Sequence, residues 1–186
     1  FKNLMNKKIT IAIDAMGGDN SPDKTIHGLS LFLKECKSDD VFFNLFGDES
    51  KIIDKIKKYS IKKNFYKIIH TASVVSDDET PLSAIKNSKN TSMWNCVKSQ
   101  IGGDSNISLS AGNTGVLMVI SKMILKMMSQ VSKPALAALW PNQKGMTVVL
   151  DLGANIECSA DNLIDFSELG SALYKSLYSN VTPRVS

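Results

Sequence analysis

The sequence predicts an α/β fold in which helices cover both faces of a mostly parallel sheet. Short apolar segments rich in β-branched or aromatic residues alternate along the chain with segments of helical periodicity. The apolar segments are nearly continuous, which is typical of parallel strands buried on both faces. With 186 residues, 43% hydrophobic and 22% charged, the chain has the size and composition of one packed domain or of part of a larger one. The sequence therefore predicts an α/β/α sandwich of three layers.

Each expected element follows from its residue pattern. Five segments are predicted as buried strands: 9–13, 41–46, 66–70, 107–110 and 146–150. Apolar side chains three or four positions apart predict helices over 26–36, 52–59, 93–101, 116–128 and 161–179. Thr80 followed by Pro81 predicts a further helix start, with Thr80 as the N-cap and proline at the first helical position. Gly102 and Gly103 are expected to close the helical region before them.

The domain organisation is expected to be simple. No repeat, low-complexity tract or linker interrupts the chain, so the sequence indicates no internal boundary. Residues 1–8 are expected to be a tail or an upstream remnant, with Met5 as the true start, and residues 9–186 to be part of a single domain. The segment 181–185 has the pattern of a strand entry, which predicts an α/β unit cut short at Ser186.

Charge and hydropathy narrow the classes of function. The net charge is +4, and Arg184 is the single arginine among 22 basic residues. Base readout relies on the arginine guanidinium, so this composition argues against a nucleic-acid-binding protein. The longest apolar runs, 116–120 and 135–140, are far shorter than the roughly 20 residues that span a bilayer. Residues 1–10 lack the apolar segment of a secretory signal, so a cytoplasmic protein is expected.

Cysteine and histidine residues give no sign of a metal site. Cys36, Cys96 and Cys158 are far apart and form no C-x-x-C pair, which is typical of reduced thiols in a cytosolic protein. His27 and His70 stand alone and are expected to be structural. We therefore expect neither a bound metal nor a cofactor.

Polar loops follow three of the predicted strands, and ligands of open α/β sheets bind beyond such strand ends. The first loop is Asp14-Ala-Met-Gly-Gly-Asp19. Its paired glycines, Gly17 and Gly18, allow backbone N–H groups to approach a ligand closely. The same pair also fits a plain tight turn, and the sequence leaves both interpretations open.

The second loop, Ser110-Ala-Gly-Asn-Thr-Gly115, leads into the predicted helix 116–128. The first N–H groups of a helix lack internal partners and its dipole is positive there, so this arrangement suits phosphate. Asn113 or Thr114 also fits an N-cap, which is compatible with anion binding. No Walker lysine follows the glycines, which excludes a nucleotide P-loop.

The third loop, Asp151-Leu-Gly-Ala-Asn155, places a carboxylate after the predicted strand 146–150. Because the carboxyl ends of parallel strands meet at one edge of a sheet, Asp14, Ser110 and Asp151 are expected to converge there. The three loops together predict a crevice that handles phosphate.

Two charged clusters allow a functional and a structural interpretation. Asp77, Asp78 and Glu79 form either a metal site or a solvated helical turn, and their consecutive positions favour the turn. Seven lysines lie between positions 51 and 67, where Asp54 is the only acid. They form either a solvated face or a docking surface for an acidic partner.

Four motifs in this order and spacing closely resemble the phosphate acyltransferase (PlsX) family of bacterial phospholipid synthesis. They are Asp14-Ala-Met-Gly-Gly-Asp19, Ser110-Ala-Gly-Asn-Thr-Gly115, Lys133-Pro-Ala135 and Leu150-Asp-Leu-Gly-Ala-Asn155. A specified hexapeptide would occur by chance in such a chain with odds on the order of 10⁻⁵. Supporting matches are Asp77-Asp78 with Pro81, Ala84 and Lys86, then Lys89 with Thr91-Ser92-Met93, and Pro183-Arg184-Val185. Lys86 stands where arginine is common in the family.

The resemblance covers the chain from about Ile9 to its end. It implies a Rossmann-like α/β/α sandwich, a homodimer, and transfer of a fatty acyl group from acyl carrier protein to inorganic phosphate, giving acyl phosphate. It also implies that the family's sequence continues past Ser186, with further glycine-rich motifs and a region that contacts the inner membrane surface. Phosphate is a competent nucleophile and a thiolate with a thiol pKa of about 8.5 is a reasonable leaving group, so neither a metal nor a covalent enzyme intermediate is required.

The loop chemistry and the resemblance together single out candidate residues. The candidates for binding phosphate or substrate are Met16, Gly17, Gly18, Asp19, Ser110, Ala111, Gly112, Asn113, Thr114, Gly115, Gly153, Ala154 and Asn155. The catalytic candidates are Lys86 and Lys89, which offset charge, and Asp14 and Asp151, which orient other groups. The candidates for docking the carrier protein are Lys57, Lys58 and Lys62.

Other functions remain open on the same fold. A CoA-dependent phosphotransacetylase is the enzyme alternative; a decarboxylating dehydrogenase would need a set of substrate-binding arginines, which a single arginine does not supply. A non-catalytic scaffold that only docks carrier protein is the alternative that is not an enzyme. An activity assay on the full-length chain separates these possibilities.

Overall fold

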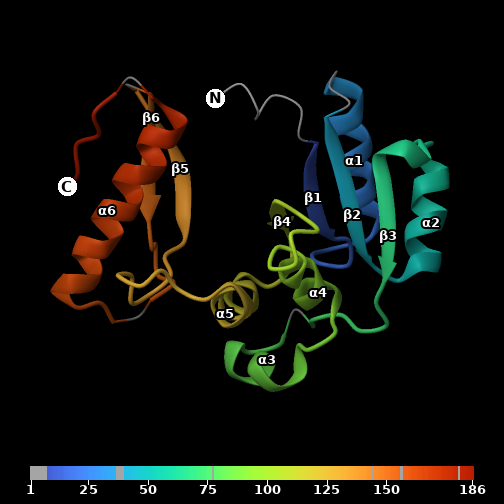
Figure 1. The fold of residues 1–186 in the computed structure, drawn as a ribbon, viewed down its shortest axis with the longest axis horizontal. Helices are drawn as coiled ribbons and strands as arrows, with labels where there is room; N and C mark the ends of the chain where they lie inside the picture. Colours follow the sequence, from blue (N-terminus) through green and yellow to red (C-terminus); the bar gives the residue numbers. More distant parts are fainter. Residues whose placement is uncertain (1–7, 37–39, 77, 144, 156, 180) are drawn as a thin grey trace. The chain divides into compact units, whose positions relative to one another are not determined.

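The computed structural model describes residues 8–36, 40–76, 78–143, 145–155, 157–179 and 181–186. The chain forms two compact units, Phe1–Lys126 and Met127–Ser186. Strands and helices alternate along the first unit, as Figure 1 shows. That both units belong to one domain stays a prediction.

The first unit is built on a parallel four-stranded sheet with the spatial order β3-β2-β1-β4. Its strands are β1 (Ile9–Asp14), β2 (Val41–Gly47), β3 (Tyr66–His70) and β4 (Ile107–Leu109). Strand β1 pairs with β2 and β4, and β2 pairs with β3, always in parallel. Parallel neighbours need crossover connections, which the helices between the strands supply. The predicted parallel sheet is therefore confirmed for this unit.

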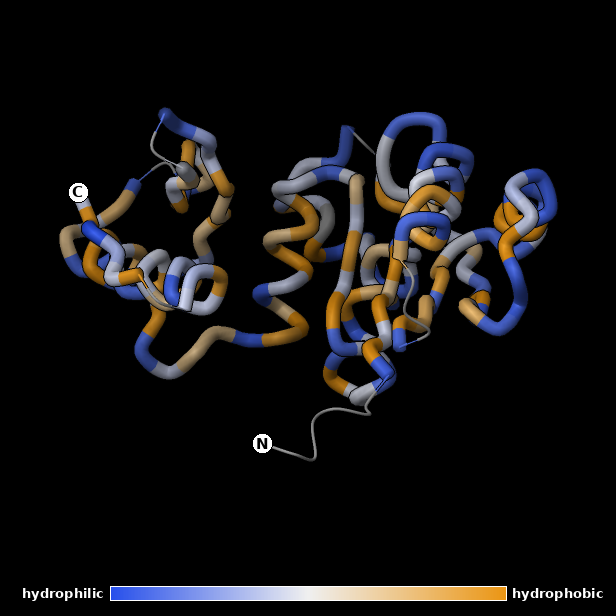
Figure 2. Tube along the Cα trace, turned by 90° about the horizontal axis from the view of Figure 1, so that it is seen from above, coloured by the Kyte–Doolittle hydropathy of each residue, from blue (hydrophilic) through white to orange (hydrophobic). Residues whose placement is uncertain are grey.

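Helices α1 (Asp23–Glu35) and α2 (Glu49–Lys58) cover one face of this sheet (Figure 1). Successive side chains of a strand point to opposite faces, so alternate residues of β1 and β2 meet these helices. The resulting core cluster is Ile13, Ala15, Ile26, Leu29, Phe43, Leu45, Ile52 and Ile56. Hydrophobic and hydrophilic positions are interspersed along the helical turns, as Figure 2 shows.

A charged contact joins α1 to the end of α2. The Asp23 carboxylate lies 2.9 Å from Lys58 Nζ and 3.2 Å from Lys55 Nζ, and it accepts a hydrogen bond of 2.9 Å from the Tyr59 hydroxyl. The hydrogen bonds from Lys58, Tyr59 and Lys55 hold the pKa of the Asp23 carboxyl well below its ordinary value. The ring of His27 stacks on Tyr59 beside this contact, which gives His27 a structural role.

Helix α4 (Ser92–Lys98) covers the opposite face of the sheet, where Cys96 packs against Ala12 and Phe46. Its other side packs on α5 (Thr114–Leu125) through a second core cluster. That cluster is Val75, Met93, Val97, Val116, Ile120 and Ile124. The unit therefore has three layers and is a Rossmann-like α/β/α sandwich.

Between β3 and α4 the chain passes beyond the carboxyl ends of the strands and forms the short helix α3 (Pro81–Asn87) (Figure 1). The backbone N–H of Ser83 donates a hydrogen bond of 3.2 Å to the Thr80 hydroxyl. The predicted helix start at Thr80 and Pro81 is thus confirmed. A 3-10 turn, η2 (Lys63–Phe65), precedes β3.

The second unit consists of an antiparallel hairpin and a helix. Strands β5 (Ala137–Asn142) and β6 (Gly145–Leu150) pair with each other, and α6 (Ala160–Leu177) follows. Ser159 and Asn162 form a capping box that starts α6. A Cβ on Gly170 would lie 2.7 Å from Leu150 Cδ1, so the absence of a side chain allows α6 to approach β6 closely.

Two strand predictions need correction. The segment predicted at 146–150 as a buried parallel strand is β6, which pairs antiparallel with β5 and contains no buried residue. Strand β4 was predicted as buried, but Ile107 and Leu109 are 50% and 56% exposed because β4 is the edge strand of the described sheet.

Two chain segments also differ from expectation. The helix predicted at 116–128 ends at Leu125, because Lys126 adopts a φ of 66° that a right-handed helix cannot continue. Residues 181–185, expected as a strand entry, form neither helix nor strand. A strand requires pairing with a neighbour, and these residues pair with none of the described strands. Among the described residues, no helix has both the length and the apolar composition needed to cross a membrane.

Candidate functional site

Asp14 ends β1 and lies buried at the carboxyl edge of the sheet, with 2% of its surface exposed. Its Oδ2 atom accepts a hydrogen bond of 2.7 Å from the hydroxyl of Ser110, which follows the neighbouring strand β4. Its Oδ1 atom accepts a second bond, of 3.3 Å, from the backbone N–H of Met16. Ser110 Oγ in turn accepts a bond of 3.1 Å from the Gly112 N–H. The predicted convergence of Asp14 and Ser110 is therefore confirmed.

The first and second loops touch because Gly17 has no side chain. A Cβ on Gly17 would lie 2.6 Å from Asp14 Oδ2, 2.7 Å from Ser110 Oγ and 2.8 Å from Gly112 N. Gly18 has a φ of +86°, and a Cβ there would lie 2.7 Å from the Ala111 carbonyl oxygen. Both glycines are thus required by close approach, and at Gly18 also by backbone conformation. The two glycines therefore do not form an isolated tight turn: they let the first loop contact the second loop closely.

The second loop leads directly into the N-terminus of α5. Asn113 is the N-cap: its Oδ1 accepts a hydrogen bond of 3.1 Å from the Val116 N–H. Its Nδ2 donates a bond of 3.1 Å to the Glu79 carbonyl oxygen, 34 positions earlier. The first turn of a helix of this length carries partial positive charge from N–H groups without intrahelical partners. This end of α5 lies next to the Asp14–Ser110 contact and suits an anion.

The other predicted groups in the first unit are less enclosed. Lys86 and Lys89 are exposed, on α3 and just beyond it. Asp19 and Thr114 are also exposed, while Met16 is half-buried. Both lysines follow Glu79, whose carbonyl oxygen accepts a hydrogen bond from Asn113 of the second loop. They therefore lie, like that loop, beyond the carboxyl edge of the sheet.

The third loop lies in the second unit and is held by its own contacts. Asp151 has a φ of 55°, and its Oδ1 accepts a hydrogen bond of 2.9 Å from Asn155 Nδ2. Asn155 Nδ2 also donates to the Pro134 carbonyl oxygen at 2.9 Å. Gly153 has a φ of +84°, a conformation that favours glycine. The convergence of Asp151 with Asp14 stays a prediction.

The environment of Asp14 also affects a thiol on α4. Burial, and next the negative charge of Asp14, raise the pKa of the Cys96 thiol to about 12. Cys96 therefore stays protonated and unreactive near neutral pH. Within the part of the chain that the structure describes, no three His, Cys, Asp or Glu side chains gather to hold a metal ion. Asp77, one of the acids considered for such a site, lies outside the described residues.

The lysines considered for docking do not all have the same surroundings. Lys57 and Lys62 are exposed, whereas Lys58 is bound to Asp23. The sequence could not show this difference, because Asp23 lies 35 positions before Lys58.

Sequence reasoning missed several groups around the site. Three buried hydroxyls, those of Thr71, Ser88 and Ser92, have no hydrogen-bond partner among the described residues. Met93 contacts the second loop, since a Cβ on Gly112 would lie 2.9 Å from Met93 Cε. Ser92 and Met93 lie in the matched stretch Thr91-Ser92-Met93, and Met93 also begins the predicted helix 93–101, whereas Thr71 and Ser88 have no such signal.

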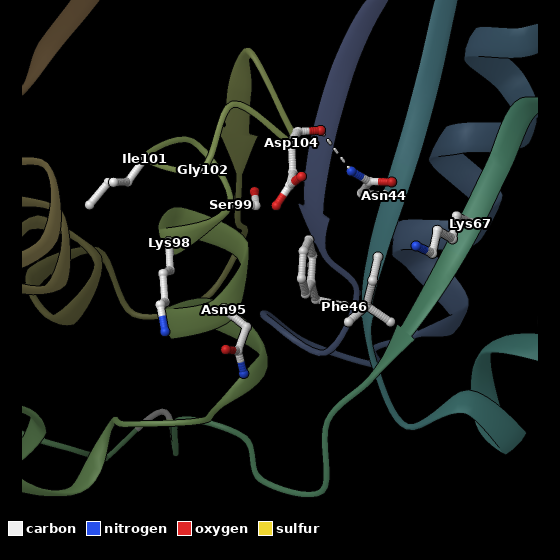
Figure 3. Close-up of a pocket in the computed structure, with 10 residues that line it drawn as sticks. Asn44, Phe46, Lys67, Asn95, Lys98, Ser99, Ile101, Gly102 and Asp104 are labelled. Carbon is white, nitrogen blue, oxygen red and sulfur yellow. Dashed lines mark hydrogen bonds between the residues drawn. The ribbon is translucent and has the colours of Figure 1, made fainter.

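A cavity of about 570 Å³ lies between α4 and the uncovered part of β2 and β3. Figure 3 shows Phe46 at its centre, with Lys98 of α4 and Lys67 of β3 on opposite sides. None of the predicted site residues lines it. The candidate site is therefore the loop cluster at the carboxyl edge rather than this cavity.

Comparison with known proteins identifies the family to which the chain belongs. The sequence model of the family described as "Fatty acid synthesis protein" matches residues 9–186. Proteins named phosphate acyltransferase from Pelagibacter ubique, Rhodospirillum rubrum and Maricaulis maris are 52%, 39% and 36% identical to the chain, over 98%, 97% and 95% of its length. The aligned regions are 54%, 51% and 50% of those proteins, so the chain spans about half their length. The chain belongs to the fatty acid synthesis protein family.

Proposed function

We propose that the full-length protein transfers a fatty acyl group from acyl carrier protein to inorganic phosphate, forming acyl phosphate for phospholipid synthesis. The observation that carries the proposal is the approach of Gly17 to Ser110 and Gly112 beside the N-terminus of α5. The name that the relatives share, phosphate acyltransferase, supports a reaction of this class.

Phosphate binds at the start of α5 in this proposal. The N–H groups of the first helical turn and the positive end of the helix dipole attract an anion. The Asp14 side chain does not contact phosphate, because a buried carboxylate would repel it, and the Ser110 hydroxyl donates its hydrogen to Asp14 rather than to phosphate. They act as positioning residues: Asp14 accepts from Ser110, and Ser110 accepts from the Gly112 N–H, which fixes the shape of the second loop. Lys86 and Lys89 offset the negative charge of phosphate.

The reaction is an acyl transfer without a covalent enzyme intermediate. A phosphate oxygen attacks the thioester carbonyl carbon, and the carbonyl π electrons move to oxygen and form an oxyanion. The oxyanion then collapses, the C–S bond breaks, and the pantetheine thiolate leaves and takes a proton from solvent. Fixed N–H donors and a lysine stabilise the oxyanion, and positioning of the two reactants supplies much of the remaining rate enhancement.

The carrier protein docks on exposed lysines in this proposal. Lys57 and Lys62 are the primary candidates, because Lys58 is bound to Asp23. A basic surface of this kind raises the association rate of an acidic partner. A homodimer, a cytoplasmic location and contact with the inner membrane surface complete the proposal for the full-length protein.

The test is formation of acyl phosphate by the full-length protein. Purified enzyme is incubated with palmitoyl carrier protein and ³²P-phosphate, and radioactive acyl phosphate is measured after extraction into organic solvent. We expect product that depends on both substrates, and less product when palmitoyl-CoA replaces the carrier protein. A preference for acyl-CoA would favour the phosphotransacetylase alternative. Binding of carrier protein without product would favour the scaffold.

A further inference from the structure

The segment between β3 and α4 leaves the body of the first unit and returns to the same place. Its two ends pair as an isolated parallel bridge between Ser73 and Thr91. The backbone N–H of Ser92 donates a hydrogen bond of 3.0 Å to the Ser73 carbonyl oxygen beside this bridge. Residues 74–90 thus form a closed excursion from the sheet, and α3 lies within it.

The excursion rests against the proposed phosphate site. The Asn113 side chain, which caps α5, donates a hydrogen bond of 3.1 Å to the Glu79 carbonyl oxygen. Pro81 lies so close to Gly115 that a Cβ on that glycine would be 3.1 Å from Pro81 Cγ. The start of α3 is therefore held against the first turn of α5, where the phosphate would bind.

Helix α3 exposes apolar side chains next to a cation. Leu82 is 76% exposed and Ile85 is 41% exposed, although both are large hydrophobic residues. They are three positions apart, and Lys86 follows Leu82 by four, so all three lie on one side of the helix. This face is apolar with a positive charge at its edge, which complements a long apolar molecule that ends in an anion.

We propose that Leu82 and Ile85 bind the fatty acyl chain of the substrate, with Lys86 close to its reacting carbonyl end, which becomes an oxyanion during the reaction and an acyl phosphate in the product. This inference rests on the proposed acyl transfer and adds the residues that recognise the chain. Two side chains are far fewer than the roughly 20–30 residues per partner of a stable protein interface, which argues against a second copy as the occupant. The contact of α3 with the start of α5 favours the substrate of that site over a membrane.

The test compares chain lengths in the full-length enzyme. The ratio of kcat/KM for hexadecanoyl carrier protein to that for butanoyl carrier protein, whose chain is too short to reach both residues, is measured for wild type, Leu82→Ser, Ile85→Ser and the conservative Leu82→Met. We expect each serine variant to lower this ratio by about tenfold, because a long chain loses more apolar contact than a short one. Leu82→Met should have the same ratio as wild type, because methionine is also apolar and of similar size. Leu31→Ser is the matched control, since Leu31 is 46% exposed on α1 and should leave the ratio unchanged.

Four results would overturn the inference. The first is an unchanged ratio in both serine variants while wild type forms acyl phosphate. The second is an equal loss with both chain lengths, which would give α3 a structural role only. The third is loss of binding to phosphatidylglycerol vesicles with an unchanged ratio, which would make α3 a membrane contact. The fourth is a changed oligomeric state in light scattering with an unchanged ratio. Absence of acyl phosphate from wild type itself would instead overturn the proposed function, and the inference with it.

Discussion

The hydroxyl of Ser110 donates a hydrogen bond of 2.7 Å to the buried carboxylate of Asp14, across 96 positions of sequence. The bond joins the loops that follow two neighbouring parallel strands, β1 and β4. It also fixes the Gly112 N–H, which donates to Ser110 Oγ. The shape of the second loop therefore depends on a carboxylate that does not itself need to touch the substrate.

Removal of this hydrogen bond should destabilise the full-length protein. Ser110→Ala leaves the buried Asp14 carboxylate without its shortest described hydrogen bond, and we expect a loss of about 1–3 kcal/mol in the free energy of unfolding. The measurement is urea unfolding followed by circular dichroism. Ser50→Ala is the matched control, because Ser50 donates a bond of the same 2.7 Å to Asp48 on the exposed surface. It should cost less than about 0.5 kcal/mol. Equal losses in the two variants would contradict a special role for the buried bond.

Gly112→Val should abolish most formation of acyl phosphate by the full-length enzyme. The new Cβ would lie 2.9 Å from Met93 Cε and 3.3 Å from Gly17 Cα, so the Met93 side chain would have to shift and the contact between Gly112 and the first loop would have to widen. Gly112 does not have a positive φ, so the effect comes from close approach rather than from backbone conformation. The measurement is the rate of acyl phosphate formation as a function of phosphate concentration. Asn113→Ala should have a milder effect, because it removes a side chain while leaving the glycines in place.

The control for this variant is Gly28→Val on α1, where a Cβ would meet nothing within 4 Å. It should leave activity unchanged, and circular dichroism should show both variants folded. A folded Gly112→Val enzyme whose rate depends normally on phosphate would indicate that phosphate binds at the first or the third loop instead.

The parallel sheet was predictable because its strands have a strong local signal. Residues 9–13 and 41–46 are apolar, β-branched or aromatic, and they appear in the structure as β1 and β2 with nearly the same bounds. The contact between Asp14 and Ser110 followed from the rule that the carboxyl ends of parallel strands share an edge.

Other features have no local signal. Strand β5 is exposed along its whole length and contains Pro141, which is unfavourable within a strand, so its pattern does not resemble a buried strand. The bond from Asn113 to Glu79 joins residues 34 positions apart and depends on how α3 packs against α5. The pairing of Lys58 with Asp23 likewise depends on how α1 and α2 pack.

The Cys96 thiol should make stability fall at alkaline pH. Burial and the charge of Asp14 raise its pKa from 9.0 to about 12 in the folded state. The thiol is therefore neutral in both states below about pH 9, ionises only in the unfolded chain between about pH 9 and 12, and favours unfolding there. At pH 11 this costs about 2–3 kcal/mol relative to neutral pH. Urea unfolding of wild type and Cys96→Ser at pH 7 and pH 11 measures the difference.

Cys96→Ser should lose less stability than wild type between these two pH values, because its hydroxyl does not ionise in this range. Cys158 is the internal comparison for reactivity, since it is exposed. Iodoacetamide at pH 8 should modify Cys158 quickly and Cys96 only after unfolding, as mass spectrometry of peptides would show. Rapid modification of Cys96 in the folded protein would contradict the raised pKa.

Reversal of charge at Lys57 and Lys62 should slow association of the full-length enzyme with acyl carrier protein. Both lysines are exposed, so Lys57→Glu/Lys62→Glu changes the surface field without breaking an ion pair in the described part of the chain. At low salt we expect an association rate about tenfold lower, and the advantage of wild type should shrink as salt rises and screens the charges. Stopped-flow fluorescence with labelled carrier protein measures these rates.

Two single variants separate docking from folding. Lys58→Glu removes a partner of Asp23, so it should lower the free energy of unfolding as well as the association rate. Lys98→Glu, at the end of α4 on the opposite face of the sheet, changes the net charge by the same amount as Lys58→Glu and should leave the association rate unchanged. If Lys98→Glu slows association as much as the double variant at low salt, then overall charge is responsible and the surface at Lys57 and Lys62 is not a docking site. If neither variant changes the rate, the lysines of α2 and its exit loop form a solvated face only.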